Sequence, residues 1–76
     1  MCLAVPGKII DISGRCAKVN IMGMETIVNT QLIENPQAGE YVLVHVGCAI
    51  EKINKEYFND LNDIFKEMAA EDNKGM

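Results

Sequence analysis

The sequence predicts a mainly β domain, a small OB-like five-stranded barrel followed by a C-terminal α-helix. Short apolar and alternating segments recur at hairpin spacing before residue 54, and single glycines separate them. After residue 54 the apolar residues change to helical spacing. Closing the strands into a barrel removes the exposed edges that promote aggregation.

The 76 residues suffice for one small domain. We expect residues 1–53 to form the barrel, 54–70 the helix and 71–76 a frayed tail. A domain of this size buries only about 60% of its unfolded surface, so it has no room for a deep enclosed cavity. The size therefore favours a non-enzymatic protein whose site is shared with a larger partner.

The first strand is expected within residues 3–12, which are rich in β-branched side chains. Its alternation places Ile10 and Ile12 on one side. Pro6 marks an edge or a bend, because proline cannot donate a hydrogen bond to a ladder.

Two further strands are expected at residues 15–21 and 24–29, separated by a turn at Met22-Gly23. Asn35 to Gly39 has the composition of another turn, since proline presets φ and glycine allows a positive φ. One face of the second strand carries Ala17, Val19 and Ile21. The partner-facing set of the third strand is either Met24, Thr26 and Val28 or Glu25, Ile27 and Asn29.

Residues 41–46 have the strongest strand pattern. His45 is expected to point outward or into a groove under the helix, opposite the valines. Gly47 is expected to interrupt the strand as a bulge or barrel corner, before extended chain resumes over 48–53. The valine face is expected to form the core: Val42, Val44 and Val46.

The last segment has the pattern of an amphipathic helix over residues 55–70. Asn54 is expected to cap it, and Glu56 favours the positive end of the helix dipole. The apolar stripe expected to dock it on the barrel comprises Tyr57, Leu61, Ile64, Phe65 and Met68.

Charge and composition exclude several classes of protein. The net charge of −4 argues against nucleic acid as a partner, because that affinity comes from Lys and Arg contacts with phosphates. We expect no membrane partner, since no apolar run approaches about 20 residues, and no secretory signal is recognisable. An odd number of cysteines, three, favours a reduced, cytoplasmic protein.

Cys2 is the candidate with the most unusual chemistry. Removal of Met1 would put an α-ammonium and a thiol on the same residue. An ammonium about 4 Å away favours the thiolate by about 1 kcal/mol even in water, and thiolate is the form that binds soft metals. The alternative is that Cys2 is only a small residue beside the start of translation. The next four residues form a stiff apolar segment for docking in a partner groove: Leu3, Ala4, Val5 and Pro6.

The only histidine, His45, is a second candidate. It is either a semi-buried residue bonded to a backbone carbonyl or a metal ligand or proton carrier. Cys16 and Cys48 are expected to pack as small hydrophobic residues. Zinc-site spacing and a glycine-rich phosphate loop are both missing from the sequence.

Two blocks of sequence, residues 1–9 (MCLAVPGKI) and residues 39–53 (GEYVLVHVGCAIEKI), resemble the HypC/HupF family of hydrogenase maturation chaperones. The resemblance implies a role in building the iron centre of nickel–iron hydrogenases. It implies two partners, a HypD-type scaffold protein and the precursor of the hydrogenase large subunit. The cargo implied is iron bearing cyanide and carbon monoxide, held transiently. The essential cysteine of the family falls on Cys2, and its histidine, a proposed participant in iron binding, falls on His45.

One residue departs from the family pattern. Relatives usually carry an aromatic residue after the His-Val-Gly step, whereas this chain has Cys48. Cys48 either fills a smaller core space or adds a thiol near the site. The leading hypothesis is a chaperone that carries the iron group through Cys2 and His45, and the alternative is an interaction module that never ligates iron.

Overall fold

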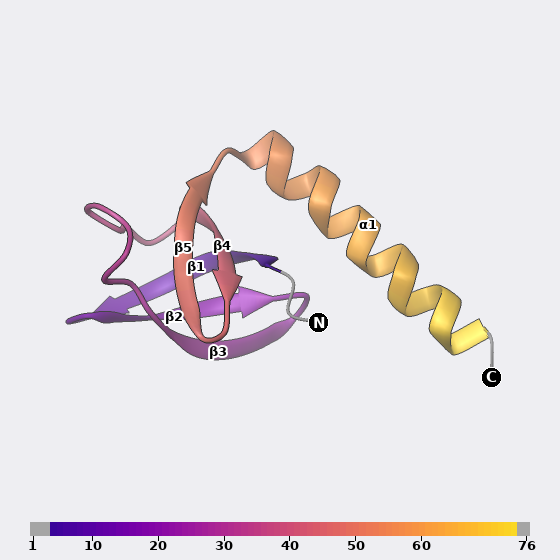
Figure 1. Ribbon diagram of the computed structural model, residues 1–76, viewed down its shortest axis with the longest axis horizontal. Helices are drawn as coiled ribbons and strands as arrows, with labels where there is room; N and C mark the ends of the chain where they lie inside the picture. The colour runs from indigo at the N-terminus through magenta and orange to yellow at the C-terminus, as the bar shows by residue number, and fades with distance from the viewer. Residues whose placement is uncertain (1–3, 75–76) are drawn as a thin grey trace.

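The computed structural model describes residues 4–74 of the chain, with side chains described for residues 4–65. Five strands close into a barrel in the order β1-β2-β3-β5-β4, which confirms the predicted fold class (Figure 1). The parallel β3–β5 contact that closes it consists of one residue pair, Asn29 with Cys48. The elements are β1 (Val5–Ser13), β2 (Cys16–Ile21), β3 (Met24–Asn29), β4 (Tyr41–His45), β5 (Cys48–Ile53) and α1 (Lys55–Lys74).

Two of the hairpins turn through two residues that both have positive φ. Met22 and Gly23 connect β2 to β3 with φ of 50° and 91°, and Val46 and Gly47 connect β4 to β5 with φ of 52° and 75°. Paired positive φ values are typical of type I′ turns, whose twist matches that of the flanking strands. The expectation of a bulge or corner at Gly47 was therefore wrong.

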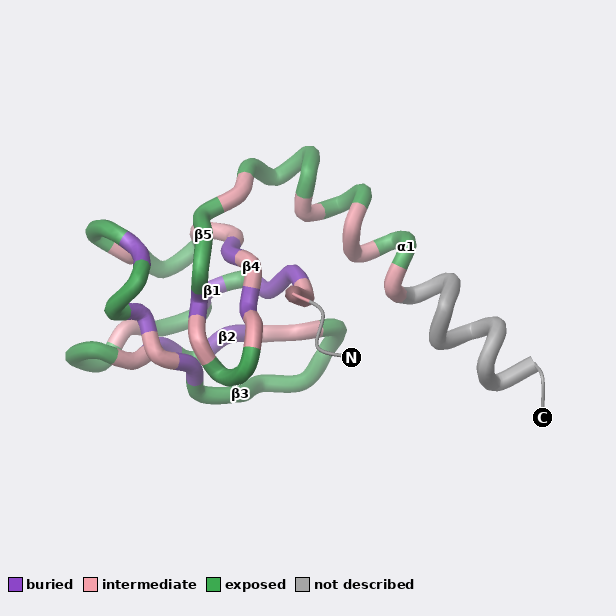
Figure 2. Tube along the Cα trace, in the orientation of Figure 1, coloured by how far each residue is buried: buried purple, intermediate pink, exposed green. Residues whose placement is uncertain are grey.

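The barrel core is small and aliphatic (Figure 2). The prediction for Val42 and Val44 is confirmed, but Val46 is 73% exposed because it lies in the turn. Of the two sets considered for β3, only Val28 is buried; Met24 and Thr26 of the same set are exposed, so neither set as a whole faces the core. The buried hydrophobic residues are Ile9, Ala17, Val19, Val28, Ile33, Val42, Val44 and Ala49.

A β-bulge changes the predicted face of β1. The register with β2 passes from Ile9 opposite Val19 directly to Asp11 opposite Lys18, so Ile10 is the extra residue. Ile9 is 1% exposed and Ile10 is 40% exposed. Placing Ile10 with Ile12 on one face was wrong, because simple alternation cannot anticipate the inserted residue.

Pro6 lies at a point where β1 pairs only with β4, opposite Leu43. The pairing of β1 with β2 begins two residues later, at Lys8. This position agrees with the expectation that proline marks an edge. Its side chain is nonetheless almost fully buried.

The connection between β3 and β4 is held against the barrel by two sets of hydrogen bonds. The backbone N–H and the hydroxyl of buried Thr30 both donate to the Arg15 carbonyl, at 2.8 and 3.0 Å. Further along, the Gly39 N–H donates to the Ile9 carbonyl, and the Ile9 N–H donates to the Glu40 carbonyl, both at 2.8 Å. The loop thereby satisfies the backbone of β1 at the bulge.

Helix α1 begins as predicted, with the Asn54 side chain accepting a hydrogen bond of 2.7 Å from the Tyr57 N–H. It continues to Lys74, past the expected end at Ala70, since the first helix-breaking residue of the sequence is Gly75. Residues 75–76 of the predicted tail lie outside the described range. None of the described helix is long and apolar enough to cross a membrane.

The predicted docking stripe of the helix is confirmed only in part, since its members Leu61 and Phe65 are half-buried. The Phe58 ring packs on Tyr41 of β4, with ring centroids 4.4 Å apart. Tyr57 and Ile64 are instead 48% and 53% exposed, and the side chain of Met68 lies outside the described residues. The half-buried positions recur at helical spacing: Phe58, Leu61, Asn62 and Phe65.

Candidate functional site

The candidate site is built around the β4–β5 turn. His45 is the last residue of β4 and Cys48 the first of β5, and the two are directly opposed in the antiparallel register. Only Val46 and Gly47 separate them along the chain. The turn therefore brings an imidazole and a thiol to neighbouring positions.

Side chains along β4 and β5 point alternately into the barrel and out of it, and this alternation determines where His45 and Cys48 point. Their neighbours Val44 and Ala49 are opposed to each other and buried in the core. His45 and Cys48 consequently point to the outer face, where both are half-buried. This confirms the outward placement of His45 and shows that Cys48 does not fill core space.

The start of β1 lies next to the end of β4. Val5 is opposite Val44, so continuing the antiparallel register by one residue brings Ala4 alongside His45. Ala4 and Val5 are half-buried, whereas Pro6 is buried. Cys2 and Leu3 lie outside the described residues.

The second described thiol lies on the same outer face but further around the barrel. Cys16 is opposite Asn29 in the β2–β3 pair, and Asn29 is in turn paired with Cys48. Cys16 and Cys48 are both free cysteines and both half-buried. Four neighbouring strands thus contribute one residue each to a row across the outer face, in the order Cys16, Asn29, Cys48 and His45. Asn29 lies between the two thiols.

The described residues do not form a closed metal site. Within that part of the chain, no group of three or more His, Cys, Asp and Glu side chains is arranged to hold an ion. A metal bound at His45 would therefore have at most one further ligand from that part of the chain, and its other ligands would come from Cys2, from a partner or from solvent.

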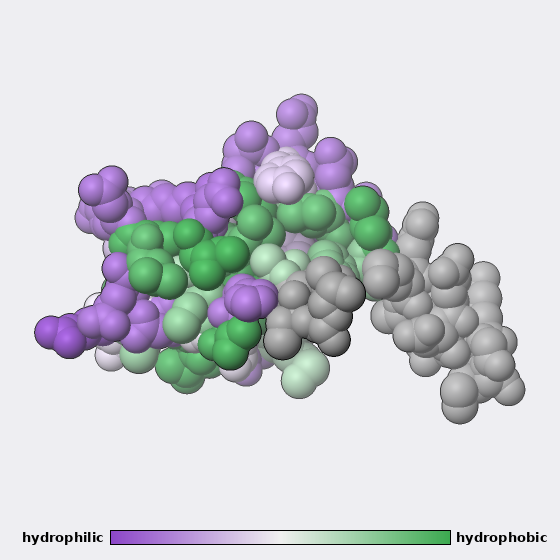
Figure 3. Space-filling view, in the orientation of Figure 1, coloured by the Kyte–Doolittle hydropathy of each residue, from purple (hydrophilic) through white to green (hydrophobic). Residues whose placement is uncertain are grey.

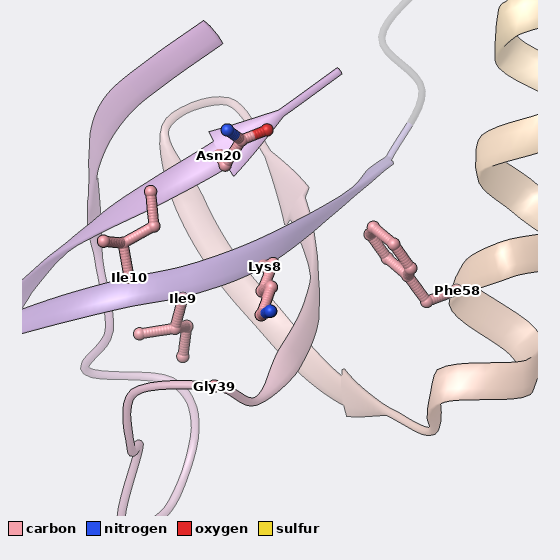
Figure 4. A pocket seen from close by; sticks show the side chains of 6 residues that line it. All are labelled: Lys8, Ile9, Ile10, Asn20, Gly39 and Phe58. Atoms are coloured by element: carbon pink, nitrogen blue, oxygen red, sulfur yellow. The ribbon is translucent and has the colours of Figure 1, made fainter. Parts of the chain in front are cut away.

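A separate cavity of about 460 Å³ lies between the barrel and α1. Figure 4 shows Phe58 pointing from the helix toward the barrel strands. The cavity walls include Lys8, whose ammonium lies 5.8 Å from the centre of the Tyr41 ring. With neither a histidine nor a cysteine in its lining, this cavity does not contribute to the candidate site.

The barrel also presents apolar surface to its surroundings. Apolar side chains gather on the face shown in Figure 3. Large exposed apolar areas are more typical of interaction surfaces than of isolated monomers. The most exposed large hydrophobic side chains of the barrel are Met24, Ile27, Leu32 and Val46, each more than 60% exposed.

The sequence alone suggested His45 as a candidate but not its pairing with Cys48. The available signal was the dipeptide Val46-Gly47 between two extended segments, which fits a two-residue hairpin turn. Valine is rare at a positive φ, so the segment resembled one strand interrupted by a glycine. Recognition of the turn would have placed His45 and Cys48 opposite each other.

Comparison with known proteins identifies the family of the chain. The HupF/HypC family matches residues 1–65. The chain is 40% identical over 74 residues to hydrogenase maturation factor HypC of Escherichia coli K12, covering 90% of this chain and 82% of that protein. It is 36% identical over 73 residues to HypC of Rhizobium leguminosarum bv. viciae, covering 95% and 97%, respectively. The family match spans the whole barrel and the start of α1, and the chain belongs to the HupF/HypC family.

Proposed function

We propose that this protein is a chaperone of hydrogenase maturation that carries an iron group and has no catalytic activity of its own. In this proposal it binds a HypD-type scaffold and the precursor of the hydrogenase large subunit, in the cytoplasm. Its cargo is iron with two cyanide ligands and one carbon monoxide, Fe(CN)2CO. The family membership supports the maturation role, since the relatives above are called hydrogenase maturation factors.

The observation that carries the iron-binding part is the pairing of Val5 with Val44. Extending this antiparallel register by one residue places Ala4 beside His45. Cys2 is only two residues further along the chain, and two residues span at most about 7 Å. A thiolate at Cys2 and the imidazole of His45 are thus within reach of one metal centre.

The chemistry of these donors suits such a cargo. Thiolate is a soft ligand, and imidazole suits iron among other transition metals. A carrier must release its cargo, and a site with one or two protein ligands releases a metal more easily than a closed cage of four. Ligands from the scaffold and the precursor then complete the coordination in turn.

The residues next to Cys2 are proposed to dock in a groove of the partner. Leu3, Ala4 and Val5 supply apolar contacts that exclude water from the thiolate. Pro6 is the last residue of this partner-binding segment. Its buried ring and fixed φ hold the start of β1 against the barrel. The exposed apolar side chains of the barrel offer further contact area.

The decisive experiment compares two cysteine variants in cells that lack their own copy of the protein. Cys2→Ala is expected to abolish copurification with the scaffold and to prevent hydrogenase maturation. Cys16→Ala is the matched control and is expected to retain both, because Cys16 lies two strands from the turn. Normal maturation with Cys2→Ala would contradict the thiol mechanism.

A second candidate function is a pure interaction module that docks partners without binding iron. It is favoured by the lack of any three-donor metal group among the described residues. In that case iron is bound only by the scaffold. Cys2→Ala would then weaken complex formation through lost packing, and Cys2→Val would restore it.

A further inference from the structure

We propose that His45 and Cys48 together form a two-donor site for a thiophilic divalent metal ion on the outer face of the barrel. The pairing rests on the register of the β4–β5 hairpin. Iron as the natural metal rests on the proposed function. Cys48 would then be a second thiol ligand in addition to Cys2.

The geometry of the hairpin brings the two donors together. Directly opposed residues of an antiparallel pair share a face and have Cβ atoms about 4.5–5.5 Å apart. His45 and Cys48 are such a pair, and both point outward. A tetrahedral ion with typical metal–sulfur and metal–nitrogen distances needs the two donor atoms about 3.5 Å apart. Side chains extending from those Cβ positions can reach this separation.

The turn holds the pair in a defined arrangement. Val46 adopts a φ of 52°, which is rare for a β-branched residue and tends to persist where the surrounding structure enforces it. Strand β3 also holds the turn in place, because the Asn29 N–H donates a hydrogen bond of 2.9 Å to the Gly47 carbonyl. The donors are therefore attached to a rigid hairpin rather than to a mobile loop.

Within the part of the chain whose side chains are described, neither donor is engaged by a neighbouring side chain. Among residues 4–65, no hydrogen bond or ion pair to the His45 imidazole or the Cys48 thiol is present. The Asn29 side chain, the nearest polar competitor in the row, is engaged by Gln31 through bonds of 2.8 and 3.2 Å. Cys16 is two strand spacings from Cys48, roughly 10 Å. This exceeds the Cα separation that a disulfide allows.

The chemistry of the pair fits an exchangeable metal. A thiolate and an imidazole are the donors preferred by zinc, cobalt and iron in proteins. Binding converts the Cys48 thiol to a thiolate and releases one proton to solvent. Two protein donors leave the other positions of the metal open, as a site that receives and passes on its cargo requires.

The test uses cobalt(II) as a spectroscopic probe of thiolate ligation in the purified protein. The starting variant is Cys2→Ser, so that the N-terminal thiol makes no contribution. We expect cobalt(II) to produce a thiolate-to-metal charge-transfer band that disappears when Cys48→Ser is added. Adding Cys16→Ser should leave the band unchanged. Adding His45→Gln should weaken cobalt affinity by more than about tenfold.

A measurement on the unmutated protein covers the case in which Cys48→Ser fails to fold. Zinc should slow the alkylation of Cys48 by iodoacetamide, as followed by peptide mass spectrometry, while Cys16 reacts at an unchanged rate. The proposal is overturned if the cobalt band is absent, persists without Cys48 or depends on Cys16, or if zinc protects neither thiol. These measurements need no scaffold or hydrogenase, so their failure is separable from failure of the Cys2→Ala maturation test.

Discussion

The barrel and the helix differ in how firmly each is held. The barrel surrounds a core in which Val19, Val42 and Ala49 have no exposed surface (Figure 2). The described part of α1 has only half-buried and exposed side chains, and its one aromatic contact with the barrel is the Phe58–Tyr41 pair. The radius of gyration is 12.6 Å, above the roughly 11 Å of a compact chain of this length, because the helix projects from the barrel (Figure 1).

This difference indicates which residues determine stability and which form the candidate site. The free energy of unfolding comes from the barrel core, since burial of apolar surface is the main favourable contribution. Of the candidate ligands, His45 and Cys48 lie on the outer face at one turn, where they contribute little to that core. Substitutions in the core and at the candidate site should therefore have separable effects, on folding and on metal or partner binding, respectively.

The largest effect is expected for Ile9→Ala in β1. The Ile9 side chain is 1% exposed, so its truncation leaves a cavity and should lower the free energy of unfolding by about 2–5 kcal/mol. Ile10→Ala is the matched control and should cost much less, because the bulged side chain is 40% exposed. Urea denaturation measures both. Equal losses for the two variants would contradict the assigned bulge.

A smaller effect is expected for Phe58→Ala in α1. The substitution removes the aromatic contact with Tyr41 and part of the apolar burial, and should cost about 1–2 kcal/mol. Tyr57→Ala, at a side chain that is 48% exposed, should change stability by less than about 0.5 kcal/mol. If Phe58→Ala costs as much as Ile9→Ala, the helix belongs to the core and the contrast between the two regions fails.

The smallest effect is expected for Thr30→Val, which keeps the shape of the side chain and removes its hydroxyl. The loss should be about 0.5–1.5 kcal/mol, since the Arg15 carbonyl still accepts the Thr30 N–H. Thr30→Ser keeps the hydroxyl donor and serves as the control in thermal denaturation. A neutral Thr30→Val would show that the loop is held by its backbone bonds alone.

The sequence predicted most of the fold because alternation and turn composition are local signals. The five strands and the Asn54 cap were predicted within a few residues. Val46 was misplaced because its turn requires a backbone conformation that valine rarely adopts. Ile10 was misplaced because a bulge interrupts alternation without changing the composition of the strand.

The face by which the helix packs on the barrel and the geometry of the candidate site could not be predicted from local patterns, because both depend on contacts between segments that are distant in the sequence. The apolar pattern favoured Tyr57 and Ile64, but the Tyr41 ring of β4 selects Phe58. His45 was predicted as a candidate from its residue type and position. Its opposition to Cys48 and its nearness to Ala4 follow from the strand register.

The most direct test of the central claim is the infrared spectrum of the protein purified without oxygen from cells that make its maturation partners. We predict cyanide and carbonyl stretching bands in the isolated protein, and their loss in Cys2→Ala with the barrel still folded. Bands that are found only in the complex with the scaffold, or that are unchanged in Cys2→Ala, would contradict a carrier that binds iron through its own thiol.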